Sequence, residues 1–165
     1  MSAREEVLLV IYRPGPSFLV LLRSPESPAA AKRTPLGTLA RSESALADSD
    51  LAPNRGYWHL VAGGIEEGEA PDAAALRELA EETALTQPAR FSPIPLELGY
   101  RPLDDDMWVT LHPYSVEVSA DWEPVLNEEH VEYRWCSEVQ AEELLEYPEP
   151  LDALRQVVRQ LEVGT

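Results

Sequence analysis

The sequence is poor in cysteine, in long apolar runs and in basic residues, and each shortage excludes a class of protein. Its single cysteine, Cys136, excludes an intrachain disulfide framework and a metal site built from several thiolates. No apolar run approaches the roughly 20 residues that a helix needs to cross a bilayer. The N-terminal stretch MSAREEVLLVIYR carries acidic residues where a signal peptide carries basic ones. We therefore expect a cytoplasmic protein with no membrane association.

The charge balance is strongly acidic, with thirteen Lys and Arg residues against thirty Asp and Glu residues and a formal net charge of -17. Binding to a nucleic-acid backbone depends on cationic residues that displace counterions. The composition therefore argues against a polymeric nucleic acid as a partner. A phosphorylated ligand is expected to be small, and a metal ion is expected to mediate its contact with the protein.

Apolar runs separated by turn residues predict the order of the elements. Residues 5–12 and 17–23 form a predicted hairpin around Arg13–Pro14–Gly15–Pro16. Further strands are predicted at Tyr57–Ala62 (running into Gly63–Gly64), Ile94–Tyr100, Met107–Val118 and His130–Cys136, with a loop at Pro102–Asp106. Helices are predicted from Pro71 or Asp72 to about Thr83, over Ser137–Glu146, and over Leu151–Glu162, the last two being separated by Pro148 and Pro150. Because strands and helices mix without βαβ alternation, the order favours an α/β fold with a mixed sheet flanked by helices.

Residues 24–55 form a long stretch rich in Ser, Pro and Ala, without a sustained apolar period. A connection of this length inside a compact domain is usually a functional lid or a mobile insertion, and we expect a mobile insertion. A short helical turn around Ser44–Asp48 is compatible with the sequence. The length of 165 residues and the absence of internal repeats predict one domain, 1–165, that contains this insertion.

The helix predicted after Gly63–Gly64 carries three glutamates on one side. At about 100° per residue, Glu78, Glu81 and Glu82 fall within an arc of about 100°. The opposite side presents Leu76, Leu79, Ala80 and Thr83. Like charges three or four residues apart destabilise a helix mildly, so the cluster is either a solvated acidic face or a patch that binds a cation. Hard oxygen ligands suit Mg²⁺ or Mn²⁺, but the helix alone does not decide between these explanations.

The spacing around this helix adds a second observation. Gly63 is followed after five residues by Glu69, and after seven more by the run Arg77–Glu82, RELAEE. This spacing resembles the signature of the Nudix hydrolase family at every fixed position except the last glycine, where Ala84 stands. A glycine just past a helix end permits a left-handed conformation that costs other residues roughly 1 kcal/mol. The helix therefore either accepts this cost at Ala84 or ends differently.

The resemblance implies a Nudix-type α/β/α sandwich with a mixed β-sheet and a catalytic loop-helix-loop that binds a divalent metal beneath a diphosphate. The metal is usually Mg²⁺, with Mn²⁺ as an alternative. By position, Glu78 and Glu82 would be the principal ligands, Glu81 a further ligand or a water-activating group, and the Gly63 carbonyl an additional metal contact. Glu69 and Arg77 would pair and hold the loop against the helix, which suits a planar guanidinium gripping a carboxylate.

The resemblance also implies a reaction, the hydrolysis of a diphosphate linkage in a nucleoside diphosphate derivative by attack of water on phosphorus. In many members a carboxylate outside the signature orients or deprotonates that water. In this chain the stretch Asn127–His130 supplies the candidates, with Glu129 preferred and Glu128 as the alternative. A polar turn that merely precedes a strand is an equally weighted explanation. The implied catalytic residues are thus Glu81, Glu82 and Glu129.

Two further stretches bear on the substrate. Tyr57–Trp58, and EHVEYRW at 129–135, resemble bacterial dihydroneopterin triphosphate or deoxynucleoside triphosphate pyrophosphohydrolases, which implies release of pyrophosphate and a monophosphate. Dinucleoside polyphosphates, ADP-ribose and nucleotide sugars are alternatives, as is a non-catalytic Nudix fold that only binds a ligand. Tyr57 or Trp58 is a candidate for stacking on the base. A homodimer is compatible with the family, whose members are often dimers.

Several aromatic and titratable residues are expected to be structural. Trp58, Trp108 and Trp135 are expected in the core or in pocket walls. His59 and His112 are expected to be packed or hydrogen-bonded, Asp104–Asp106 to form a solvated loop, and Cys136 to be a buried inert thiol. The sequence assigns no role to His130.

Overall fold

The computed structural model describes residues 4–24, 56–101 and 107–163. The predicted insertion at 24–55, apart from Ser24, and the helical turn within it therefore lie outside the described residues. The loop predicted at Pro102–Asp106 also lies outside them. The single domain, the insertion and the solvated loop stay predictions.

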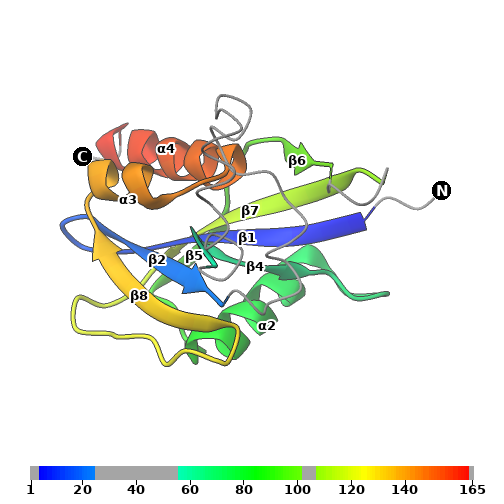
Figure 1. The fold of residues 1–165 in the computed structure, drawn as a ribbon, viewed down its shortest axis with the longest axis horizontal. Coiled ribbons are helices and arrows are strands. Elements are labelled where there is room, and N and C mark those ends of the chain that lie inside the picture. Colours follow the sequence, from blue (N-terminus) through cyan, green and yellow to red (C-terminus); the bar gives the residue numbers. More distant parts are fainter. Residues whose placement is uncertain (1–3, 25–55, 102–106, 164–165) are drawn as a thin grey trace, which may run out of the picture.

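The N-terminal hairpin lies in an eight-stranded mixed sheet (Figure 1). Strand β1 (Arg4–Arg13) pairs antiparallel with β2 (Ser17–Arg23) beside the turn, where Tyr12 lies opposite Phe18. This pairing confirms the predicted hairpin. Residues Val7–Ile11 are almost fully buried, which suits a continuous apolar strand covered on both faces.

The next stretch crosses from one of these strands to the other. Strand β3 (Tyr57–His59) pairs antiparallel with β2, and β4 (Val61–Gly64) pairs antiparallel with β1. The strand predicted at Tyr57–Ala62 is thus divided at Leu60. Because β4 ends at Gly64, the chain leaves the sheet at the glycine pair and enters the loop before the acidic helix.

The remaining strands flank this centre. Strand β7 (Val109–Glu117) runs parallel to β1 and forms antiparallel pairs with β5 (Arg90–Pro93) and β6 (Leu98–Tyr100), while β8 (His130–Cys136) pairs antiparallel with β2. The prediction of a strand from Ile94 was wrong, because residues 94–97 lie outside the strands. Pro95 has no N–H to give to a sheet ladder, so the run is interrupted there.

Helices cover both faces of the sheet. Figure 1 shows α2 (Pro71–Thr83) on one side, with α3 (Glu138–Leu144) and α4 (Pro148–Val163) on the other. Each face has its own apolar cluster, one that includes Leu79 of α2 and one that includes Leu154 of α4. The expected α/β/α sandwich with a mixed sheet is confirmed. None of the described helices combines the length and hydropathy needed to span a membrane.

The first of the two closing helices begins at a well-defined cap. The Ser137 side chain accepts a hydrogen bond from the Gln140 N–H, and the Gln140 side chain accepts one from the Ser137 N–H, forming a capping box. The last helix begins at Pro148 and not at Leu151 as predicted. Both prolines lie in its first turn, where the N–H that proline lacks would have no helical acceptor.

Candidate functional site

Helix α2 follows β4 after the loop 65–70, and the residue just past its end has a positive φ. Pro71 occupies its first turn, which confirms the predicted start. At the other end Ala84 adopts the left-handed conformation, with φ 67°, and its N–H donates to the Ala80 carbonyl at 2.9 Å. The helix therefore ends as it would with glycine, and Ala84 accepts the conformational cost.

The orientation of α2 differs from the prediction for its two faces. Leu76, assigned to the core side, is 41% exposed, whereas Ala74 and Ala75 are fully buried. Glu78 is only 8% exposed and Glu82 is 0% exposed, so the glutamates do not form a solvated acidic face. The helix turns part of its carboxylate side inward, toward the sheet edge at β4 and β8.

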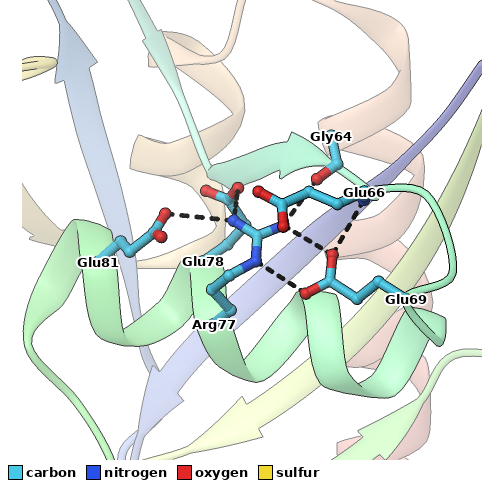
Figure 2. Close-up of polar contacts among 6 residues, drawn as sticks. All are labelled: Gly64, Glu66, Glu69, Arg77, Glu78 and Glu81. Carbon is cyan, nitrogen blue, oxygen red and sulfur yellow. Dashed lines mark hydrogen bonds and ion pairs between the residues drawn. The ribbon is translucent and has the colours of Figure 1, made fainter.

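Arg77 ties the loop, the strand end and the helix together (Figure 2). Its Nε donates to Glu69 Oε2 at 2.8 Å and its Nη2 donates to Glu69 Oε1 at 2.9 Å, a bidentate pair. Nη2 also donates to the Gly64 carbonyl at 2.9 Å, and the Glu66 N–H donates to Glu69 Oε1 at 2.9 Å. The Arg77 hydrogen bonds lower the pKa of Glu69 to about 2. Glu69 and Arg77 thus form a pair that joins the loop to the helix.

The same guanidinium also contacts two of the signature glutamates. Nη1 of Arg77 donates to Glu78 Oε1 at 2.8 Å and to Glu81 Oε2 at 3.3 Å. Glu81 is the more exposed of the two, its side chain retaining 54% of its accessible surface. Within the chain itself, Arg77 therefore supplies the positive charge that offsets the negative charges of Glu78 and Glu81.

Gly63 lies directly against the Glu78 carboxylate. A Cβ atom built at this position would overlap the carboxylate atoms of Glu78, whereas one at Gly64 would meet nothing. Only glycine therefore allows the strand end and the Glu78 side chain to approach each other in this way. This close approach brings the Gly63 backbone beside a candidate metal ligand.

Glu82 forms a second and very different environment on α2. It is completely buried, and neither carboxylate oxygen has a hydrogen-bond partner among the described residues. Burial, reinforced by the neighbouring Glu78 carboxyl, raises the pKa of Glu82 well above its usual value, while Arg23 opposes the shift. A buried carboxylate without partners is costly, so this one is suited to bind a cation.

His130 and Arg23 lie beside Glu82. His130 Nε2 is 3.4 Å from Glu82 Oε1, and burial lowers the pKa of His130 to about 3, so its ring is neutral near pH 7. Arg23 and His130 are partners in the pairing of β2 with β8, and each is only 4% exposed. The Nε atom of Arg23 has no hydrogen-bond partner among the described residues.

The two candidate general bases outside the signature are placed differently. Glu129 is half-buried just before β8, its carbonyl accepts the Ser24 N–H at 2.7 Å, and its charge contributes to the raised pKa of Glu82. Glu128 is exposed. Of this pair, Glu129 is the one whose charge acts on the buried carboxylate.

The candidate stacking residues are engaged with other side chains. Tyr57 is 5% exposed and makes edge contacts with His59 and Tyr147. Trp58 is half-buried, with the Arg134 guanidinium 4.7 Å from its ring centroid. Contact with a base would require Trp58 to use its uncovered surface or Arg134 to move.

The other residues predicted to be structural are mostly placed as expected. His59 Nδ1 lies 2.9 Å from the Leu60 carbonyl and His112 Nε2 lies 2.8 Å from Glu5 Oε1, confirming hydrogen-bonded roles. Cys136 is buried, and burial raises the pKa of its thiol. Trp108 is 50% exposed and lines a pocket beside β6 and β7, so it fits the expectation of a pocket wall and not that of a core residue.

The residues present fit a hard divalent cation, although the side chains are not arranged as a finished site. Among the residues that the structure describes, no three acidic, histidine or cysteine side chains are grouped as ligands, and Arg77 bonds to Glu78 and Glu81 instead. The fit rests on the two unpartnered oxygens of Glu82 and on the close approach of Gly63 to Glu78.

Sequence reasoning missed Arg23 and gave His130 no role. Arg23 stands at the end of an apolar strand, where a long cationic side chain is ordinarily exposed, and only the fold shows that it is buried. His130 had one usable signal, its position directly after the two candidate bases.

Comparison with known proteins identifies the domain. A family model described as "NUDIX domain" matches residues 39–157. An octanoyltransferase from Myxococcus xanthus is 33% identical over 114 residues, covering 65% of this chain and 29% of that protein. Nudix hydrolase 25 from Arabidopsis thaliana is 47% identical over 45 residues, covering 27% of this chain and 26% of that protein. The matches thus span less than a third of these two curated relatives.

Solved structures share the fold at low sequence identity. A Caenorhabditis elegans Ap4A hydrolase superposes with a TM-score of 0.70 at 21% identity, covering 98% of this chain and 99% of that one. The Escherichia coli dihydroneopterin triphosphate pyrophosphohydrolase gives 0.68 at 20% identity, covering 94% and 95%. The NUDIX domain of Shewanella oneidensis NrtR, complexed with ADP ribose, gives 0.68 at 18% identity, covering 98% and 90%.

Proposed function

Because this chain belongs to the NUDIX domain family, we propose that it is a pyrophosphohydrolase that cleaves a diphosphate linkage with the help of Mg²⁺, or of Mn²⁺ in its place. The preferred reaction converts a nucleoside or pterin triphosphate to a monophosphate and pyrophosphate. One observation carries the proposal: the signature carboxylate of Glu82 is fully buried without a hydrogen-bond partner among the described residues. A chain that used this fold only for structure would gain stability by replacing such a group.

Each signature residue has a proposed task. Glu78 and Glu82, with the Gly63 carbonyl and Glu81, would hold the metal, and Arg77 with Glu69 would keep the loop against α2. When bound, the metal would supply charge neutralisation on the diphosphate. The carboxylate of Glu129, with Glu81 as the alternative, would accept the proton of the attacking water. The water oxygen forms the new bond to phosphorus while the bridging P–O bond of the diphosphate breaks, and its electron pair leaves with the departing pyrophosphate or monophosphate.

The substrate class is proposed from two stretches of the sequence and from proteins of the same fold. Proteins of this fold include ones named for dihydroneopterin triphosphate and Ap4A, and one complexed with ADP ribose. We propose a triphosphate because Tyr57–Trp58 and the EHVEYRW stretch resemble those pyrophosphohydrolases, and Trp58 is the better placed of the pair to meet a base. Dinucleoside polyphosphates, ADP-ribose and nucleotide sugars are the alternatives. We propose no acyl transfer from the octanoyltransferase match, since it covers only 29% of that protein.

A ligand-binding module without catalysis is the alternative from another class. Its usual mark is the loss of signature carboxylates, and all of them are present in this chain. A cytoplasmic location and a homodimer stay predictions.

The test is a product assay on a panel of nucleoside triphosphates, dihydroneopterin triphosphate, ADP-ribose and diadenosine polyphosphates. Each substrate is assayed with Mg²⁺, with chelator, and with the Glu82→Gln variant; Glu132→Gln serves as a matched control, because Glu132 is a half-exposed glutamate on β8. Metal-dependent pyrophosphate release from a triphosphate, lost only in Glu82→Gln, is the expected result. Turnover of the dinucleotides or ADP-ribose alone would replace the substrate class, and no turnover with retained ligand binding would favour the binding module.

A further inference from the structure

The hydrogen bonds around Asn127 determine which nitrogen of His130 carries the proton. The Glu129 N–H donates to Asn127 Oδ1 at 3.1 Å, which identifies that atom as the amide oxygen. His130 Nδ1 lies 3.3 Å from the same oxygen. Because an amide oxygen can only accept, Nδ1 must be the donor. In the neutral imidazole the lone pair is then on Nε2.

This lone pair faces a second acceptor in the protein interior. Nε2 has no hydrogen-bond partner among the described residues, and both the His130 and the Glu82 side chains are 0% exposed. The nearest acidic atom is Glu82 Oε1, at 3.4 Å. Two buried acceptors facing each other repel unless a positive charge is shared between them. The arrangement is therefore complete only when a proton or a metal ion lies between the two atoms.

The separation of the two atoms suits one metal ion. Metal–nitrogen and metal–oxygen bonds of about 2.1 Å, at right angles or wider, place adjacent donor atoms about 3.0 to 3.5 Å apart. The surrounding charge also favours a cation, because the two arginines, Arg23 and Arg77, are outnumbered by the carboxylates. These are Glu69, Glu78, Glu81, Glu82 and Glu129. A neutral imidazole adds a ligand without adding positive charge.

We propose that His130 is a metal ligand, and that its Nε2 and Glu82 Oε1 bind the same divalent ion. The inference rests on the proposed function for the existence of a metal site and adds a nitrogen donor to it. Imidazole favours first-row transition-metal ions over Mg²⁺, which prefers an all-oxygen environment. The site is thereby suited to ions such as Mn²⁺, Fe²⁺ or Co²⁺. The remaining donors would come from Glu78, Glu129, water and the substrate.

Pulsed electron paramagnetic resonance of the Mn²⁺-loaded chain tests this directly. The wild type is expected to show echo modulation from a directly coordinated nitrogen, and histidine labelled with the heavier nitrogen isotope is expected to shift its frequency. The signal is expected to disappear in His130→Gln. It is expected to persist in His112→Gln, a matched control on β7 whose ring pairs with Glu5. The isotope shift in the wild type keeps the test valid if His130→Gln fails to fold.

Metal affinity gives an independent reading. By calorimetry, His130→Gln is expected to raise the Mn²⁺ dissociation constant about tenfold or more, with a smaller effect on Mg²⁺. His112→Gln is expected to leave both constants unchanged. A merely structural role for His130 would lower the melting temperature without changing the ratio of the two constants.

The outcomes separate this inference from the proposed function. Mn²⁺ binding without nitrogen modulation would overturn the role of His130 and indicate that a proton is shared with Glu82 instead, while hydrolysis of the panel could still be observed. Failure to bind Mn²⁺ at all would overturn the inference as well. Nitrogen modulation without hydrolysis of any panel substrate would support the inference and count against the proposed reaction.

Discussion

Helix α2 and the loop before it contain two carboxylates whose surroundings are opposite in character. Glu69, held from the preceding loop by Arg77, is partly exposed, and its oxygens accept hydrogen bonds from Arg77 and from the Glu66 N–H. Glu82, further along the helix, is fully buried, and its oxygens accept no hydrogen bond from the described residues. The pKa of Glu69 is lowered, whereas the pKa of Glu82 is raised.

The difference separates support from binding. Both oxygens of Glu69 accept hydrogen bonds from Arg77, so this pair stabilises the fold without any ligand. The oxygens of Glu82 lack hydrogen-bond partners among the described residues, so the free energy needed to bury this carboxylate is offset only when a cation binds to it. The family resemblance already implies support for Glu69 and metal binding for Glu82. The structure adds the physical difference between them, in burial and in hydrogen bonding.

The largest expected effect comes from neutralising Glu82. Glu82→Gln is expected to lower kcat roughly a hundredfold or more, because a neutral amide is a poor ligand for Mg²⁺. In chelator, its melting temperature is expected to equal or exceed that of the wild type, since the buried charge is gone. Assays of turnover and thermal unfolding, with Glu132→Gln as control, check both parts. A variant that retained activity would contradict the assignment of Glu82.

Removing the supporting arginine should lower the stability of the fold, unlike the removal of the Glu82 charge. Arg77→Ala is expected to lower the melting temperature by roughly 3 to 6 °C in chelator and also to reduce turnover, because Glu69 and the Gly64 carbonyl lose their donor. The matched control is Arg90→Ala, whose ion pair with Glu117 is exposed and contributes little. If Arg77→Ala proved stable and fully active, the supporting role would be wrong.

The next largest effect is the loss, at low pH, of the stability that the Glu69–Arg77 pair contributes. The folded-state pKa of Glu69 is about 2, below its ordinary value of 4.5, so the pair stabilises the fold above the ordinary value and loses this contribution as the pH falls toward 2. Glu69→Gln is therefore expected to be less stable than the wild type at pH 6, and the gap should close toward pH 2. Denaturant midpoints over this range measure it, and a gap that stayed constant with pH would contradict the linkage.

The smallest expected effect leaves both environments intact. Ala84→Gly is expected to stabilise the fold by about 1 kcal/mol, because Ala84 adopts a left-handed conformation that glycine adopts without strain. Turnover should not change, since Ala84 is exposed and lies past the end of α2. Equilibrium unfolding measures the gain, and a destabilised Ala84→Gly would show that the methyl group packs favourably.

Local patterns predicted the elements well where local chemistry decides them. The helix bounds at Pro71 and Thr83 and the strand His130–Cys136 were correct, because capping residues and apolar runs act over a few positions. The strand at Ile94 was wrong for the reason that Pro95 interrupts it. Pro148 was read as a separator although proline is tolerated in a first helical turn.

The burial of individual site residues was less predictable. A helical wheel shows which residues share a side of α2 but not how the helix is rotated against the sheet, so Leu76 was assigned to the core and Glu82 to a carboxylate face. The convergence of Arg23 with His130 depends on the pairing of β2 with β8, which are distant in sequence. Such long-range pairing leaves no local signature.

The central pairing of the sheet also has a consequence during synthesis. Strand β1 pairs in parallel with β7 from Arg4 opposite Val109 to Tyr12 opposite Glu117, so its longest partner is made late. Contacts of such high sequence separation slow folding. Until β7 leaves the ribosome, the apolar stretch Val7–Ile11 has one open edge and could pair with other nascent chains. Strand β1, which lies at the centre of the finished sheet, is therefore exposed to aggregation while the chain is incomplete.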